Sequence, residues 1–298
     1  MTSVPVAEPP PRESLGRRLS TFFYRHPRIR LAALLAVPVG WMVVVYFGSL
    51  VVLLLSAFWD TNPFTSEVVR ELTLDNFRTL FEREVYRDVA WRTIQMAALV
   101  TIADAVLAFP IAYYMARIAS PRTRNLLVVA VLMPLWANYL VKVYAWRTML
   151  SDGGVINWAL EPLGLQFDGY STVGLWLVFT YLWLPFMVLP IYAGLERIPA
   201  SLLEASADLG GRSLTTFTRV VLPLAFPAVV AGSIFTFALT LGDYIAPGLI
   251  TSEQFIGTVI YSIRGEALPV AAAYSMVPIV VMIAYLLVAR RLRAFESL

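Results

Sequence analysis

The residues that carry most protein chemistry are scarce in this sequence, which has no cysteine, one histidine and one lysine. Without cysteine, neither a disulfide framework nor a thiolate metal site can form. The single histidine, His26, precedes the first long apolar segment, which excludes most histidine-based catalysis and metal binding. We therefore expect no catalytic set, no metal site and no cofactor bound by the chain itself.

Charge is also scarce, because only 14% of the 298 residues are charged while 59% are hydrophobic. Soluble domains usually carry about 25% charged residues. A soluble protein of this composition could not cover its apolar surface, so the composition indicates an integral membrane protein. The net charge of +3 is modest and supports no nucleic-acid partner.

Long apolar runs recur at the length needed to cross about 30 Å of hydrocarbon. The first is Leu31–Phe58, and the others lie near 91–116, 125–149, 172–194, 222–246 and 271–289. The pattern predicts an all-α integral membrane protein with about six transmembrane helices. A polar, basic tail over residues 1–30 would precede one transmembrane domain over residues 31–298.

The basic residues alternate between loops. The tail, the second loop, the fourth loop and the C-terminal end together hold 15 of the 23 basic residues, whereas the loops between them hold five basic residues and twelve acids. The positive-inside rule then places both termini on the cytoplasmic side of a prokaryotic cell membrane. The tail would rest on anionic membrane lipid.

One predicted cytoplasmic segment, residues 196–223, is too polar to span the membrane. Ala200–Leu209 contains good helix formers, and Ser201 with Glu204 three residues later is typical of a capping box. The segment therefore predicts a short amphipathic helix, with Ser201 at its N-cap.

A second helix should follow this one after a glycine turn. Gly210 and Gly211 should end the first helix, because glycine tolerates the left-handed conformation found there, and Ser213 is placed to cap the next helix, which runs to Val220. An exposed amphipathic element of this kind is suited to dock into a groove of another protein.

The spacing within this segment resembles the EAA motif of binding-protein-dependent ABC importer permeases: Glu-Ala-Ala, three residues, Gly, nine residues, then Ile-x-Leu-Pro. Ser206 stands where that motif has an alanine, and Val220 where it has an isoleucine. The resemblance implies a type I importer permease fold with N and C termini in the cytoplasm. It also implies that an ATPase subunit contacts the motif residues, Glu204, Ala205, Ser206, Gly210, Leu222 and Pro223.

The chain lacks a phosphate-binding loop, since its one lysine, Lys142, is in the wrong context. The resemblance therefore implies a non-catalytic subunit, with ATP and Mg²⁺ held by partner ATPase subunits. It further implies a second, homologous permease subunit, an extracytoplasmic substrate-binding protein, and transport by alternating access.

Two further segments narrow the resemblance. Pro134–Trp146 (PLWANYLVKVYAW) and Leu241–Ile250 (LGDYIAPGLI) are similar to the spermidine/putrescine permease subfamily. This similarity implies a polyamine or related small amine as cargo.

Asp104 falls near the middle of the second predicted span, where an ionisable residue is costly and is a functional candidate by default. Ala97, Thr101, Ala108 and Ile111 share its face, which is small and weakly polar. Two interpretations stay open: the face lines a transport pathway, or it allows another helix to approach closely.

The fifth predicted span carries a polar stripe at steps of three or four residues, formed by Ser233, Thr236, Thr240 and Asp243. Such a stripe should face protein or water rather than lipid, either in a substrate pathway or in helix packing. Carboxylates with aromatic walls suit a multiply charged amine, and Tyr244 and Trp183 are the candidate wall residues.

Lys142 favours a different cargo, because a buried ammonium group repels a polyamine unless it is paired. It either snorkels to the interface, pairs with Asp152 or a first-loop acid, or indicates an anionic or zwitterionic substrate. The main alternative to an ABC permease is an ion-coupled secondary transporter, with Asp104 or Asp243 as the proton or sodium site.

Overall fold

A computed structural model describes residues 24–62, 65 and 67–291, and the chain divides into one unit up to Leu55 and a second from Ser56 onward. The first unit is essentially one helix. In it α2 (Pro27–Trp41), the π-helical η1 (Met42–Phe47) and α3 (Gly48–Ser56) follow one another without interruption, over 30 residues. The predicted basic tail falls mainly on residues 1–23, which, like Arg293, lie outside the described residues.

The second unit opens with a short antiparallel strand pair, β1 (Asp60–Thr61) and β2 (Val68–Val69), in which Asp60 pairs with Val69. Helix α4 (Asp75–Glu82) follows. The buried amide of Asn76 donates hydrogen bonds to the carbonyls of Ala57 and Trp59, at 2.9 and 2.7 Å. These bonds fix the segment that leads into the strand pair against α4.

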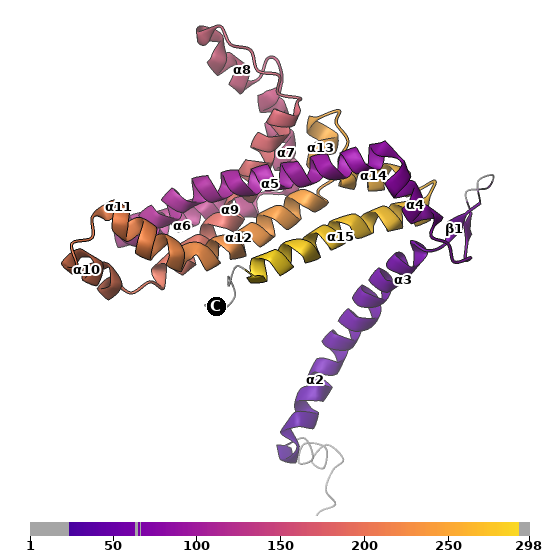
Figure 1. Ribbon diagram of the computed structural model, residues 1–298, viewed down its shortest axis with the longest axis horizontal. Coiled ribbons are helices and arrows are strands. Elements are labelled where there is room, and N and C mark those ends of the chain that lie inside the picture. The colour runs from indigo at the N-terminus through magenta and orange to yellow at the C-terminus, as the bar shows by residue number, and fades with distance from the viewer. Residues whose placement is uncertain (1–23, 63–64, 66, 292–298) are drawn as a thin grey trace, which may run out of the picture. The chain divides into compact units, whose positions relative to one another are not determined.

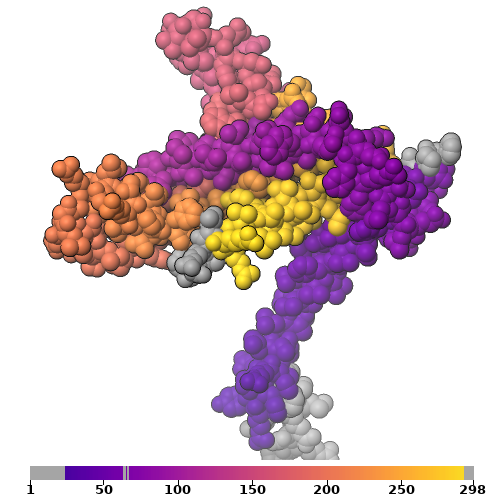
Figure 2. All heavy atoms as spheres, viewed as in Figure 1, coloured from indigo at the N-terminus to yellow at the C-terminus, as the bar shows by residue number. Residues whose placement is uncertain are grey.

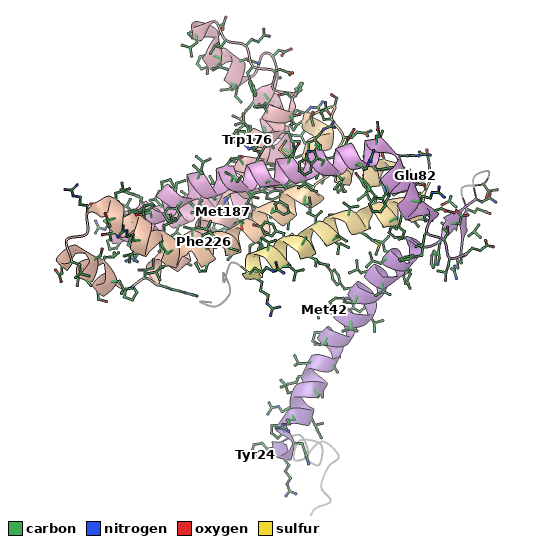
Figure 3. All side chains as sticks on the ribbon, in the orientation of Figure 1. Tyr24, Met42, Glu82, Trp176, Met187 and Phe226 are labelled. Atoms are coloured by element: carbon green, nitrogen blue, oxygen red, sulfur yellow. The ribbon has the colours of Figure 1, made fainter. Side chains whose placement is uncertain are left out.

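Three long helices form the central bundle of this unit: α5 (Glu84–Tyr113), α9 (Thr172–Glu196) and α12 (Leu222–Gly242). Helix α15 (Leu268–Arg291) runs alongside α12 (Figure 1). Small residues let the backbones approach closely, as is common between membrane helices. A Cβ atom on Gly232 would lie 2.7 Å from the sulfur of Met187, which is buried inside the bundle (Figure 3).

The two largest apolar clusters lie one toward each end of the bundle. The α10-side cluster packs Met187, Val188, Ile191 and Leu195 of α9 against other helices; its remaining buried members are Ala108, Ala112, Met115, Ile198, Val221 and Ala225. The α7-side cluster lies nearer the start of α9 and contains Met96, Val100, Val143, Leu150, Leu175, Val178, Phe179, Leu182, Trp183, Ala246, Ile250 and Phe255.

The span predicted at 125–149 is not a single helix, and this corrects the sequence interpretation. It is divided into α6 (Pro121–Trp136) and α7 (Tyr139–Leu150), and the axis bends by 94° at the break. Ala137 and Asn138 take extended conformations, and the Asn138 side chain accepts a hydrogen bond from the Leu140 amide at 2.9 Å, so that it caps α7. Within the described residues, five helices are long and apolar enough to cross a membrane, or six when this bent pair counts as one span.

Shorter elements complete the second unit. Helix α8 (Val155–Leu160) and the 3₁₀ turn η3 (Glu161–Leu163) follow α7, while α13 (Ile245–Ile250) and α14 (Ile256–Ile263) connect α12 to α15. Helix α5 ends in the π-helical η2 (Tyr114–Ile118). Helices α10 (Ala200–Asp208) and α11 (Ser213–Thr216) precede the π-helical η4 (Phe217–Val221), which continues directly into α12.

Candidate functional site

The segment singled out by its spacing forms a helix, a glycine turn and a second helix, as predicted. Helix α10 ends at Asp208 with Leu209 as its C-cap, and the next residue, Gly210, has a φ of +76°, the left-handed conformation. The Gly211 amide donates to the Ser206 carbonyl at 2.8 Å and the Gly210 amide to the Ala207 carbonyl at 2.9 Å. This pair of bonds is a Schellman motif, which satisfies the last carbonyls of a helix.

The predicted helix caps are wrong. The N-cap of α10 is Pro199 rather than Ser201, and that of α11 is Arg212 rather than Ser213; neither helix has a side-chain cap. Pro199 has a φ of −62° and an extended ψ of 140°, so the turn into α10 is set by the proline ring without a capping hydroxyl.

The second glycine of the predicted turn, Gly211, is required by close packing. A Cβ atom on Gly211 would lie 2.6 Å from the Ser206 carbonyl oxygen and 2.7 Å from its hydroxyl. The hydroxyls of Ser206 and Thr216 are 2.8 Å apart and join α10 to α11 across the turn. The helix pair is therefore a tightly closed unit.

This unit is attached to the bundle on one side and exposed on the other. Leu203 and Phe217 pack against the α10-side cluster, and the Phe217 ring contacts Phe109 at 5.5 Å between centroids. Glu204, Ala205 and Gly210 are exposed, as are Leu222 and Pro223 at the start of α12. Ser206 is half-buried, and Leu209 is 89% exposed. Figure 2 places the atoms of α10 and α11 at one end of the bundle.

Asp104 lies on α5 between Val100 of the α7-side cluster and Ala108 of the α10-side cluster. It is fully buried, and neither carboxylate oxygen has a hydrogen-bond partner in the described part of the chain. Thr101 and Ala97 on the same face are also buried, as the shared helix face predicted. A buried, unpartnered carboxylate is costly, which makes Asp104 a candidate for a functional role.

The polar stripe of α12 is buried and faces other helices. The Thr236 hydroxyl donates to that of Thr101 on α5 at 3.3 Å, and the Tyr285 hydroxyl of α15 donates to Ser233 at 2.6 Å. Thr240 donates to the carbonyl of Thr236 at 2.8 Å. In this conformation the hydroxyls of the stripe join α12 to α5 and α15.

Asp243, at the end of the stripe, is the C-cap of α12 and lies just before α13. Its Oδ1 accepts hydrogen bonds from the amides of Ile245 and Ala246 at 2.8 and 3.1 Å, and its Oδ2 accepts one from the Tyr139 hydroxyl of α7. The Tyr139 ring stacks on Trp183, with centroids 6.0 Å apart and an interplanar angle of 15°. The carboxylate thus has an aromatic wall, of which Tyr139 was not predicted from the sequence.

The two predicted wall residues lie in different surroundings. Trp183 is buried in the aromatic cluster beside Asp243, and its indole nitrogen has no partner among the described residues. Tyr244 is 42% exposed and stacks on Tyr261 of α14 at 4.8 Å. Only Trp183 therefore belongs to the wall formed with Tyr139.

Lys142, half-buried on α7, makes no ion pair with any described residue, so the pairing with Asp152 that was considered is absent. Among the described residues, no three metal-ligating side chains come together. The interior therefore offers two carboxylates, hydroxyls, one ammonium group and aromatic faces to a bound solute.

Comparisons with known proteins agree with one another. Residues 86–295 match the family described as binding-protein-dependent transport system inner membrane component. The chain is 48% identical to the inner membrane ABC transporter permease protein YdcU of Escherichia coli (strain K12), over 98% of this chain and 99% of that one. It is 32% identical to the spermidine/putrescine transport system permease protein PotB of the same organism, over 74% and 82% of the two chains.

A solved structure has the same fold. It is that of a bacterial alginate ABC transporter in complex with an alginate pentasaccharide-bound periplasmic protein, with a TM-score of 0.70 at 19% identity. The alignment covers 94% of this chain and 98% of that chain.

Proposed function

The chain belongs to the family of binding-protein-dependent transport system inner membrane components, and on that premise we propose which of its parts receives the ATPase and which cargo it carries. It is a multi-pass inner membrane protein, a non-catalytic permease subunit of an ABC importer with the fold of its structural neighbours.

The observation that carries the assignment of the coupling element is the exposed α10 with its closed glycine turn. We propose that Glu204, Ala205 and Gly210 contact an ATPase subunit, together with the other motif residues, Ser206, Leu222 and Pro223. Leu202 and Leu209 are exposed and offer an apolar edge, and the closed turn holds α10 as a preformed element. A preformed helix loses little conformational entropy when it binds.

The partners follow from the family. They are a pair of ATPase subunits that hold ATP and Mg²⁺, a second related permease, and an extracytoplasmic binding protein, which the alginate transporter structure also contains in its periplasmic form. ATP binding would bring the coupling helices together and open the cavity outward, and hydrolysis would reset it. The α10 end of the bundle is then cytoplasmic, with both termini on that side.

We propose a polyamine or related small amine as the cargo. The similarity to PotB supports it, and so does the arrangement of Asp243 with the rings of Tyr139 and Trp183, because a carboxylate beside aromatic faces suits an alkylammonium ion. Asp104 and the hydroxyls of Ser233, Thr236 and Thr240 would border the pathway in another conformation of the bundle.

Lys142 favours a second candidate, an anionic or zwitterionic solute, because its ammonium group has no acidic partner among the described residues. Uptake of radiolabelled putrescine, spermidine and glutamate into proteoliposomes with the whole complex separates the two. The amine proposal predicts that both amines are imported and that Asp243→Asn, which keeps an oxygen for the Ile245 and Ala246 amides, raises the KM for them. Import of glutamate alone would refute the amine proposal.

A further inference from the structure

Arg117 holds the last turn of α9. It lies in the π-helical η2 at the end of α5, and its Nη2 donates to the carbonyl of Leu195 at 2.5 Å and to that of Ile198 at 2.7 Å. The last carbonyls of a helix lack intrahelical partners, and a positive charge near them is favourable. One guanidinium therefore joins the end of α5 to the end of α9.

The carbonyls held by Arg117 lie directly before the coupling helix. Ile198 is buried, Pro199 is the N-cap of α10, and α10 begins at Ala200. The start of α10 is thus fixed to α5 through one side chain. Leu203, in the first half of α10, adds an apolar contact with the α10-side cluster.

The chain is also held to α5 after α10. The Phe217 ring in η4 contacts Phe109 at 5.5 Å and Tyr113 at 6.0 Å, both on α5. A polar clamp therefore precedes α10 and an aromatic contact follows it, and both are made to the same helix. A movement of α10 and α11 as one body would therefore also move the end of α5.

The clamp lies where the helices depart from α-helical geometry. Arg117 belongs to one π-helical stretch and Phe217 to another, and such stretches are frequent at functional sites. Arg117 Nε is buried and has no partner in the described part of the chain, so the guanidinium keeps a donor for a further acceptor when the helix ends shift.

We propose that Arg117 is a positioning residue that transmits motion of α10 to α5, and through α5 to Asp104, about 20 Å along the helix. The inference rests on the proposed role of α10 as the ATPase-docking element. Arginine suits the task because its planar fork reaches two carbonyls, which a lysine ammonium group does not match in geometry.

A solely structural role is the competing explanation, since capping a helix end contributes to stability without coupling. The test compares Arg117→Gln and Arg117→Lys with the control Arg122→Gln, which changes an exposed arginine in the first turn of α6. Spin labels on Val106→Cys in α5 and Asp208→Cys in α10 report the distance between the two helices. The chain has no cysteine of its own, so these are its only labelled positions.

The labelled complex, with accessible cysteines of its partners removed, is measured without nucleotide and after trapping with ADP and vanadate. Wild type and Arg122→Gln should keep one narrow distance in both states, because α5 and α10 move together. Arg117→Gln should assemble, yet its distance should change or broaden on trapping. Stimulation of its ATPase activity by the binding protein should fall by a typical coupling factor, about 5- to 150-fold, with Arg117→Lys between.

Equal behaviour of Arg117→Gln and Arg122→Gln would overturn this inference and leave the proposed function standing. So would a loss of assembly in both Arg117 variants with unchanged distance and stimulation in the complex that remains. Failure of the wild-type chain to bind an ATPase subunit would instead overturn the proposed function and the inference with it.

Discussion

The hydroxyls of Ser206 and Thr216 lie 2.8 Å apart and bridge the two helices of the coupling segment, at the position where the EAA motif has an alanine. Ser206→Ala removes this bond and keeps the backbone bond from Gly211 to the Ser206 carbonyl. We expect a loss of about 0.5–1.5 kcal/mol in stability of the segment. Hydrogen exchange of the Gly210 and Gly211 amides in the purified complex measures it, with Thr216→Ser, which keeps a hydroxyl, as the matched control.

Gly210 is needed for its backbone conformation and not for space, because no atom lies within 4 Å of a Cβ placed on it. At a φ of +76°, a β-branched side chain is strained by roughly 1–2 kcal/mol, whereas asparagine tolerates the left-handed region. Gly210→Val should therefore uncouple ATP hydrolysis from transport with the membrane fold kept, and Gly210→Asn should stay close to wild type. Transport by the complexes, normalised to ATPase activity, measures the effect; normal coupling in Gly210→Val would refute the assignment of this turn.

Much of the coupling segment could be predicted from the sequence, because its signals are local. The helix predicted over Ala200–Leu209 is observed at Ala200–Asp208, and the turn glycine is the one expected. The caps were wrong because a proline before the helix sets the chain direction and leaves the nearby serines without a capping role. Both Gly210 and Gly211 were expected to end the helix, but the close contact between Gly211 and Ser206 appears only in three dimensions.

The membrane interior was less predictable. Hydropathy gave the apolar segments, but it is insensitive to the break between α6 and α7, where Asn138 as a helix cap was the one available signal. Tyr139 and Asp243 are 104 residues apart, and no local pattern pairs them. Arg117 could have been noticed as a lone basic residue in the last turn of its helix, yet its carbonyl partners are 78 and 81 residues away.

We expect the Asp104 carboxylate to lower the stability of the protein and to be needed for transport. Its carboxylate is fully buried without a hydrogen-bond partner in the described part of the chain, and Asp104→Asn keeps the volume and removes the charge. We expect a gain in the free energy of unfolding, because an unsatisfied buried carboxylate costs more than the neutral amide that replaces it. Thermal denaturation of the detergent-solubilised protein measures it, and transport by the variant should fall. A destabilised variant would mean that the carboxylate has a partner in the assembled protein.

Tyr139 should matter through its hydroxyl as well as its ring. Tyr139→Phe keeps the stacking on Trp183 and removes the hydrogen bond to Asp243, and a bond to a charged group contributes about 1.5–3 kcal/mol. We expect a lower thermal midpoint and freer movement of α7 relative to α13. Proteolysis of the loop after α7 reports this movement, with Tyr144→Phe, an exposed tyrosine of the same helix, as the control. Equal cleavage rates in the two variants would contradict the role given to the hydroxyl.

The most direct test of the account is co-purification of the tagged chain in detergent, comparing wild type with a Glu204→Ala/Gly210→Val double variant. The account predicts that wild type brings down an ATPase subunit and a second permease. The variant should keep the permease and lose the ATPase, because its membrane bundle is unchanged while its coupling helix is altered. Purification of the wild-type chain alone as an active transporter would contradict the account and would direct attention to Asp104 and Asp243 as ion-coupling sites.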